Sequence, residues 1–506
     1  MDQSTLLTWI IFLPLVGIPF VLGMPSEKKK EIRFIATAFT AAPLVLGLFL
    51  LRVFDPSNTG VQLQHHFVWI RSFNIEYFVG VDGLSVLMIF LTLLISFIAA
   101  IASWGIEKYL RGYFALFLLL ETGMLGTFCS LDFFLFYIFW EVMLLPMYFL
   151  IGIWGGPRKE YAAIKFFLYT LFGSLLMLIA MIALYYNSVP TTLVDGTPAN
   201  HTFNILKLIH ENDFGSVGTF LGFEFPKIMF VLLFIGFAIK VPVVPFHTWL
   251  PDAHVEAPTP ISVILAGVLL KMGGYGILRF NFGILPEATK WAAPALAVLG
   301  GISIVYAAFV CMAQKDLKKL IAYSSVSHMG FVLLGMAAFT DQGIFGSVLQ
   351  MWTHGLISPM LFLLAGVIYD RAHHREIDGF GGLAYQMPEY TGMLGLAFMA
   401  SLGLPGLAGF ISEITVFLGA FPTYRVITII SALAVVITAA YYLWALQRMF
   451  LGKLNEKYVG LPDLTWRERI TLYPLGALII ILGVFPMPVI NLISKTLSTM
   501  IQVFQG

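Results

Sequence analysis

Charged side chains are scarce in this 506-residue sequence: Asp, Glu, Lys and Arg make up 11% of it, against 59% hydrophobic residues. A soluble domain carries roughly 25% charged residues, because its surface must stay hydrated. The chain lacks the charge to cover the several soluble domains that its length would otherwise suggest. The composition therefore excludes a soluble globular protein and predicts one membrane domain, in contact with the lipid bilayer, over residues 1–506.

Cysteine and an excess of basic charge are also lacking. The only cysteines are Cys129 and Cys311, whereas iron–sulfur clusters are held by about four thiolates, so this chain alone is expected to hold none. The net charge of +1 excludes nucleic-acid binding, which needs a basic face. No G-x-G-x-x-G follows a strand, so a nicotinamide or flavin site is unsupported. We expect neither a cofactor nor a metal in this chain.

What the sequence does contain is long apolar runs. A transmembrane helix needs about 20 apolar residues, and runs of this kind are separated by charged or Gly/Pro-rich breaks. They predict an all-α polytopic membrane protein with about 14 transmembrane helices. The expected spans are 5–23, 33–52, 80–104, 113–130, 133–154, 162–186, 228–247, 259–281, 290–312, 320–339, 344–369, 391–421, 426–448 and 471–494.

Lys and Arg in the connecting loops indicate the orientation of these spans. If the spans alternate, 19 of the 29 basic residues share the side of residues 28–33, and eight lie on the opposite side. The first side is therefore expected to be cytoplasmic, with both termini and the long loops 53–79 and 187–227 outside. Cys129 and Cys311 then lie at opposite ends of the bundle, too far apart for a disulfide.

Seven ionisable residues fall inside predicted spans, where an uncompensated charge costs at least about 2.5–3.5 kcal/mol. They are Glu121, Glu141, Lys240, Lys271, His328, His354 and Glu413. All but the last lie eight to twelve residues from the start of their span, near the midplane, although the spans run in alternating directions. This common depth predicts a row of ionisable groups in the plane of the membrane, which suits a lateral relay of charge.

Two of the charged spans carry backbone breaks. Pro242 and Pro245 follow Lys240, and each proline removes a backbone donor. In the twelfth span, the Gly/Pro-rich run 403–409 precedes Glu413. Broken helices in corresponding positions of two halves are typical of transporters built from inverted repeats. We therefore predict broken helices 7 and 12, and two inverted five-helix repeats made of spans 4–8 (113–281) and 9–13 (290–448), followed by a final helix over 471–494.

Each candidate residue also has a simpler interpretation. Glu141 could pair with Lys240 and shift its proton affinity, or the two could form a static buried ion pair. His328 and His354 could relay protons, could be neutral hydrogen-bonded side chains, or could together ligate a haem. Lys271 has no acid in its own span, which argues against a static pair.

The segment 247–258 is expected to be an inward-facing loop whose acids and histidines pass protons toward Lys240 and Lys271. A solvated loop without such a role is the alternative. The accessory candidates, together with Glu121 as the weakest acid of the spans, are His247, Asp252, His254 and Glu256.

Several motifs then identify a resemblance that covers essentially the whole chain. They lie at 80–85, 139–146, 240–260, 269–276, 323–330 and 403–413, and the run His-Thr-Trp-Leu-Pro-Asp-Ala-His at 247–254 is the most specific of them. The chain resembles the antiporter-like, proton-pumping subunits of respiratory complex I (NADH–quinone oxidoreductase), and among these the M type, called subunit 4 in mitochondria.

The resemblance implies roles for the mid-membrane residues. Glu141 and Lys240 match the ion pair of the first half, Lys271 the central relay lysine, and His328 and His354 its continuation. Glu413 matches the acid of the second broken helix, where the L- and N-type subunits and related sodium/proton antiporters usually place a lysine.

The resemblance also implies partners and a location. Neighbouring L- and N-type subunits are expected, with NADH, FMN, iron–sulfur clusters and quinone held by other subunits. The expected location is an energy-coupling membrane, that of the bacterial cell before a thylakoid or mitochondrial inner membrane. Three alternatives stay open: a subunit of a multisubunit cation/proton antiporter, a photosynthetic variant fed by ferredoxin, and a scaffold that transports nothing.

Overall fold

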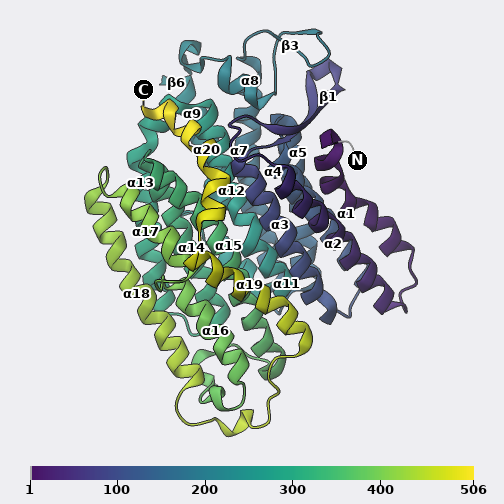
Figure 1. Cartoon of the computed structure of the whole chain (residues 1–506), viewed down its shortest axis with the longest axis vertical. Helices are drawn as coiled ribbons and strands as arrows, with labels where there is room; N and C mark the ends of the chain where they lie inside the picture. The colour runs from purple at the N-terminus through teal and green to yellow at the C-terminus, as the bar shows by residue number, and fades with distance from the viewer. Residues whose placement is uncertain (1–2, 221, 506) are drawn as a thin grey trace.

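The computed structural model describes residues 3–220 and 222–505 as an elongated bundle of helices (Figure 1). Apolar segments become helices because a helix satisfies its own backbone hydrogen bonds where lipid offers none. The helical elements of the first half are η1 (Gln3–Thr5), α1 (Leu6–Gly23), α2 (Lys29–Val53), η2 (Arg71–Phe73), α3 (Gly83–Ala102), η3 (Ser103–Gly105), α4 (Leu110–Cys129), α5 (Phe133–Val142), α6 (Leu144–Trp154), α7 (Lys159–Tyr186), α8 (Ile205–His210), η4 (Phe214–Val217) and α9 (Phe225–Lys240).

The second half continues the bundle. Its helical elements are α10 (Trp249–Glu256), α11 (Thr259–Ile264), η5 (Leu265–Leu269), α12 (Leu270–Gly276), η6 (Ile277–Phe282), α13 (Pro286–Met312), α14 (Leu317–Ala337), α15 (Asp341–Ala372), η7 (Ile377–Gly379), η8 (Leu383–Tyr385), α16 (Pro388–Ser401), α17 (Ala408–Ala420), α18 (Arg425–Phe450), η9 (Glu456–Tyr458), α19 (Trp466–Val484) and α20 (Met487–Gln505). The segments η5 and η6 are π-helical and flank α12 on both sides.

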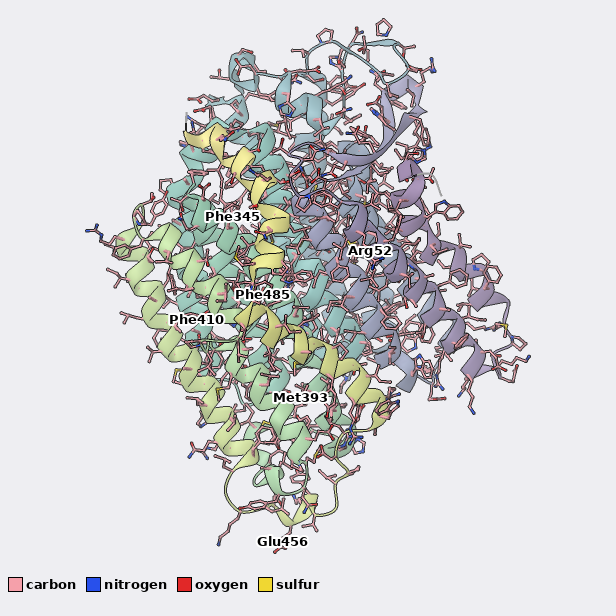
Figure 2. The ribbon with its side chains drawn as sticks, in the orientation of Figure 1. Arg52, Phe345, Met393, Phe410, Glu456 and Phe485 are labelled. Atoms are coloured by element: carbon pink, nitrogen blue, oxygen red, sulfur yellow. The ribbon has the colours of Figure 1, made fainter. Side chains whose placement is uncertain are left out.

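The mostly helical membrane architecture predicted from the sequence is confirmed, but three small antiparallel hairpins were not predicted. They pair β1 (Gln62–Ile70) with β2 (Ile75–Val81), β3 (Thr191–Thr192) with β4 (Pro198–Ala199), and β5 (Thr219–Phe220) with β6 (Phe223–Glu224). All lie at one end of the bundle, whereas Glu456, in the connection from α18 to α19, lies at the other (Figures 1 and 2). The two long loops therefore share one side, as the basic residues indicate.

In the described part of the chain, eleven helices are long and apolar enough to cross a membrane, or up to twelve if a bent pair counts as one span. The predicted breaks are present: α9 ends at Lys240 and α16 ends at Ser401, and each is followed by turns before the next helix. The halves of these broken spans are too short to count as separate spans. The total of about fourteen spans and the two inverted repeats remain predictions.

The prediction of one final helix over 471–494 is wrong. Two helices, α19 and α20, meet there at an angle of 71°. Phe485 lies at this bend (Figure 2) with a non-helical backbone, φ −135° and ψ 75°, and Pro486 follows it. Proline disfavours the helical conformation of the preceding residue, so the chain leaves the helix at this point.

A buried ion pair connects the start of α3 to η6. Asp82 caps α3 by accepting a hydrogen bond from the backbone of Ser85, and its other oxygen lies 2.6 Å from an Arg279 guanidinium nitrogen. Arg279 also donates to the Tyr275 hydroxyl, which in turn donates to the carbonyl of Phe128 in α4. Three helical segments are thereby connected beside the helix that carries Lys271.

We predict that Asp82→Asn strongly destabilises the protein. Asparagine retains the capping oxygen but leaves Arg279 buried without its counter-charge, a change that typically costs about 3–5 kcal/mol. Lys290→Gln is the matched control, because it removes the exposed pair with Glu287, and such pairs contribute about 0–1 kcal/mol. The melting temperatures of the two purified variants compare these costs, and equal melting temperatures would show that the buried pair is unimportant.

A second buried acid lies among the loops at the hairpin end. Asp132 caps α5 by accepting a hydrogen bond from the Leu135 backbone, and it accepts another from the backbone of Glu76 in β2. Burial raises the pKa of Asp132 from 3.8 to about 7, because the ionised form loses its hydration. The pKa of Glu76 is lowered, since hydrogen bonds from His66, Val194 and Asn204 outweigh its own burial.

The two acids give opposite pH dependences. For Asp132 the folded state holds its proton more tightly than the unfolded state, so its contribution to stability falls as the pH rises from about 4 to about 7. We expect Asp132→Asn, which keeps the capping oxygen, to remove this fall. Melting temperatures measured from pH 4 to 8 test this expectation, and an unchanged pH profile in the variant would contradict it. The Glu76 contribution is lost only at lower pH and should persist in the variant.

Candidate functional site

The centre of the site is the Lys271 ammonium on α12. The Lys271 side chain is fully buried, and Nζ donates to the carbonyl of Ala266 in the π-helical segment η5. Nζ also lies 2.7 Å from Nδ1 of His354 on α15. π-Helical turns are rare and often mark functional sites, and here such a turn supplies a backbone acceptor for a buried lysine.

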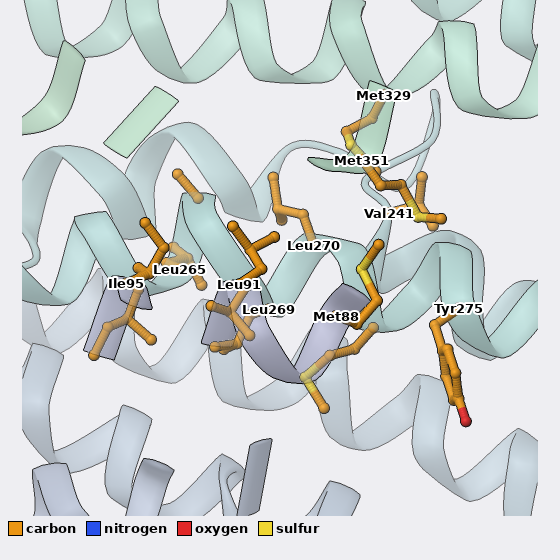
Figure 3. Close-up of a cluster of buried hydrophobic side chains, with 14 of the residues drawn as sticks. Met88, Leu91, Ile95, Val241, Leu265, Leu269, Leu270, Tyr275, Met329 and Met351 are labelled. Atoms are coloured by element: carbon orange, nitrogen blue, oxygen red, sulfur yellow. The ribbon is translucent and has the colours of Figure 1, made fainter. Parts of the chain in front are cut away.

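Apolar side chains enclose this part of the chain. Figure 3 shows Leu91 of α3, Leu269 of η5, Tyr275 of α12 and Met351 of α15 packed around the helix that carries Lys271. All four are almost fully buried. A charge in such surroundings interacts strongly with its few polar neighbours, because little water screens it. The affinity of Lys271 for its proton therefore depends on the state of His354.

From His354 the polar contacts continue to an acid. The His354 and His328 ring centroids are 5.7 Å apart, and Nδ1 of His328 lies 3.2 Å from a carboxylate oxygen of Glu413 on α17. A cavity of about 10 Å³ lies between these three side chains, which is about the space that one water molecule needs. Lys271, His354, His328 and Glu413, here called the relay, thus form a series of neighbouring buried ionisable groups.

The break between α16 and α17 shapes the Glu413 end of the relay. Ser401, the last residue of α16, lies 3.0 Å from Nε2 of His328 and donates to the hydroxyl of Tyr442. Gly403 adopts a φ of +81°, and a Cβ added to it would lie 2.7 Å from a Glu413 oxygen. The positive φ favours glycine at this turn, and the absence of a side chain leaves room for the Glu413 carboxylate.

The predicted pair of Glu141 and Lys240 is not an ion pair in the described part of the chain. The Lys240 ammonium lies over the rings of Trp140 and Phe166, at 5.2 and 5.7 Å, whereas Glu141 is partly exposed on α5. Consecutive side chains point about 100° apart around a helix axis. Because Trp140 faces Lys240, the Glu141 side chain points in a different direction. The two groups still interact electrostatically, and Lys240 is 2% exposed.

The segment 247–258 is not the inward-facing loop that the sequence predicts, nor the solvated loop that was the alternative, because most of it forms the buried helix α10. His247 and Glu256 are buried, and His254 is fully buried with its ring stacked on Phe362. Asp252 forms an ion pair of 2.7 Å with Lys165 of α7. Trp249 and Leu250 are apolar and fully buried, so α10 packs inside the protein. The polar residues of the same helix are buried with them.

Other candidates lie outside the relay. Glu121 is fully buried in α4, and neither carboxylate oxygen has a hydrogen-bond partner.

Among the residues that the structure describes, no group of three or more His, Cys, Asp or Glu could hold a metal ion. The haem alternative is contradicted, because His328 and His354 face Glu413 and Lys271 and the cavity between them is far too small for a porphyrin.

Four polar residues near the relay were not identified from the sequence. Besides Ser401 and Tyr442, they are Gln350 and Ser412, where the Ser412 hydroxyl donates to Gln350 and lies 2.9 Å from the Thr353 hydroxyl. Serine, glutamine and tyrosine are common in helices, so their type alone carries no signal. The position of Ser401 just before a Gly/Pro-rich break is the one signal that could have identified it.

Comparison with known proteins identifies the family. A family model described as NADH:quinone oxidoreductase/Mrp antiporter, TM, matches residues 130–438. The chain belongs to this family. The matched region contains both broken helices and all six principal candidates, from Glu141 to Glu413.

Relatives within the family extend the similarity over the full length. The chain is 39% identical to NADH-quinone oxidoreductase subunit M of Rickettsia bellii, covering 100% of both chains. A chain of respiratory complex I from Thermus thermophilus has a TM-score of 0.86 at 29% identity, covering 99% of this chain and 100% of that one. A chain of the Mrp complex from Dietzia sp. has a TM-score of 0.84, covering 100% of both chains; its identity of 19% shows a shared fold alone.

We predict that Gly403→Ala destabilises the protein more than Gly406→Ala does. Both glycines have a positive φ, at +81° and +92°, so both variants incur the backbone strain of about 1 kcal/mol or more. A Cβ at Gly406 meets no atom within 4 Å, whereas one at Gly403 meets the Glu413 carboxylate. The difference in melting temperature therefore isolates that contact, and equal values would mean that Glu413 does not need the close approach.

Proposed function

We propose that this chain is a proton-translocating membrane-arm subunit, of the M type, in an NADH–quinone oxidoreductase. The observation that carries the proposal is the continuous relay from Lys271 through His354 and His328 to Glu413. Proton carriers must lie within hydrogen-bond reach of each other or be linked by a water molecule. These four groups meet that condition and are buried from bulk solvent.

A proton moves along the relay by single transfers between named atoms. The Lys271 ammonium gives a proton to Nδ1 of His354, and Lys271 becomes a neutral amine. Nε2 of His354 has no hydrogen-bond partner, so it can release its own proton toward the small cavity beside His328. Protonated His328 then forms an ion pair with Glu413 or passes its proton to that carboxylate. Each transfer moves positive charge toward α17.

Energy for these transfers comes from other subunits in this proposal. In this proposal NADH, FMN, iron–sulfur clusters and quinone belong to partner subunits, and the L- and N-type subunits are the neighbours of this chain. Glu141 and Lys240 sense the state of the neighbouring subunit through their electrostatic interaction. Support comes from relatives named NADH-quinone oxidoreductase subunit M and from the family match.

We also infer the membrane in which the chain lies and the symmetry between its two halves. The membrane is an energy-coupling one, that of the bacterial cell, with both termini on the outer side. The breaks after α9 and α16 support two inverted repeats over 113–281 and 290–448. A multisubunit cation/proton antiporter shares the fold, but the greater sequence identity lies with the oxidoreductase relatives.

Lys271→Met in the assembled complex tests the proposal. Methionine fills a similar volume without a charge, so the bundle should remain folded while the relay loses its first carrier. We expect NADH oxidation to continue with a clearly reduced ratio of protons translocated per electron, measured in sealed vesicles. Lys290→Met, at a lysine paired on the surface, is the control and should keep the normal ratio.

A normal ratio in an assembled Lys271→Met complex would contradict proton translocation through this relay. Proton exchange that needs sodium or potassium but no redox partner would favour the antiporter instead. Flavin and iron–sulfur subunits that purify with this chain are expected under the oxidoreductase proposal only.

A further inference from the structure

The hydroxyl groups beside His328 form a series of hydrogen bonds that all run in one direction. The Ser401 hydroxyl donates to the Tyr442 hydroxyl at 2.8 Å. Tyr442 also forms a hydrogen bond with the Ser324 side chain, whose own hydroxyl donates to the backbone carbonyl of Ile321 at 2.8 Å. A hydroxyl has one proton to donate, and a carbonyl only accepts. Ser401, Tyr442 and Ser324, here called the hydroxyl series, therefore all donate away from His328.

This direction determines which nitrogen of the His328 ring carries the hydrogen. Nε2 lies 3.0 Å from the Ser401 oxygen. Because Ser401 gives its single proton to Tyr442, its oxygen is left to accept, so Nε2 must be the donor. A neutral imidazole has one N–H group. Neutral His328 therefore has its lone pair at Nδ1, and it accepts a proton only there.

The accepting nitrogen faces Glu413. Nδ1 lies 3.2 Å from a Glu413 carboxylate oxygen, and both side chains are 5% exposed. A lone pair and an ionised carboxylate repel each other at this distance, whereas one proton between the two atoms makes a hydrogen bond. His328 is also the only ion-pair partner of Glu413 among the described residues. A buried carboxylate with neither a proton nor a counter-charge is costly, so a proton shared with His328 is favoured.

The other tautomer of His328 would bind a different number of protons. With its hydrogen on Nδ1, a neutral ring would donate to an ionised Glu413, and the two side chains together would carry one negative charge. With its hydrogen on Nε2, the contact forms only when one further proton is bound, and the two side chains together are neutral. The hydroxyl series thus decides the charge at this end of the relay.

We propose that Ser401 and Tyr442 are positioning residues that fix the tautomer of His328, so that His328 and Glu413 hold one proton in common. The shared proton lies on the Glu413 oxygen or on Nδ1, while Nε2 keeps its hydrogen. A second proton that arrives through the small cavity between the histidines protonates both partners, and the release of one proton restores the shared state. The proposal rests on the function proposed above, because it describes how one end of that relay holds its proton.

Nitrogen-15 NMR of the assembled complex in membranes measures this tautomer directly. In a sample with labelled histidine at neutral pH, a ring nitrogen that carries hydrogen is distinguished from one with a lone pair. The His328 signals are identified by their loss in His328→Gln. We expect Nε2 of His328 to carry hydrogen in the wild-type protein, and a lone pair at Nε2 would overturn the proposal.

Tyr442→Phe tests the positioning role. It removes the acceptor of the Ser401 proton, which leaves Ser401 free to donate to Nε2 of His328. We expect the His328 hydrogen to move to Nδ1 in most molecules, and the proton-to-electron ratio in sealed vesicles to fall. Tyr441→Phe is the matched control, because it removes the hydroxyl of the adjacent, similarly buried tyrosine while the bond from Ser401 to Tyr442 remains. It should keep the wild-type tautomer and ratio.

Variants of Ser401 repeat the test at the other end of that bond. Ser401→Ala removes the oxygen that holds Nε2 as a donor and should raise the fraction of the Nδ1 tautomer, whereas Ser401→Thr keeps the hydroxyl and should keep the wild-type tautomer. If assembled Tyr442→Phe and Ser401→Ala complexes show the wild-type tautomer or the wild-type ratio, the positioning role is overturned and the relay stands. If Lys271→Met keeps the wild-type ratio, the proposed function itself fails, whichever tautomer is found.

Discussion

The free-energy cost of removing ionisable groups from water is the constraint on which the rest of this structure depends. A bundle with so few charged residues still encloses several of them, and each must find a partner or exchange its proton. Asp82 and Arg279 meet this constraint with a closed ion pair of 2.6 Å. The relay meets it differently, because Lys271 faces a histidine rather than a carboxylate. A closed pair holds its charge in place, whereas a lysine beside an imidazole can transfer its proton.

Departures from regular helix supply the geometry that the relay needs. A regular helix uses its carbonyls internally, so it has few acceptors to offer a buried ammonium. The π-helical segment before α12 provides the Ala266 carbonyl for Lys271. The break after α16 provides the Ser401 hydroxyl and the space at Gly403 that Glu413 fills. Backbone irregularity inside a membrane protein is tolerated where it lines such a polar site.

The two halves of the chain treat their buried charges differently. In the second half, histidines connect Lys271 to Glu413 in a series of short contacts. In the first half, aromatic rings surround Lys240, and Glu141 lies turned away from it. Cation–π contacts stabilise an ammonium without offering it a proton acceptor. The first half is therefore suited to responding to charge, and the second half to carrying protons.

The sequence by itself determined the membrane class, the common side of the two long loops, the two broken helices and all four members of the relay, since these follow from hydropathy, charge and Gly/Pro positions along the chain. Depth in the membrane can be counted along a helix, which is why Lys271, His328 and His354 could be predicted together. The direction in which a side chain points around its helix depends on packing, so only the tertiary structure separated Glu141 from Lys240. Packing also decided the bend before α20, the burial of α10 and the stacking of His254 on Phe362, because each depends on contacts between segments far apart in the sequence.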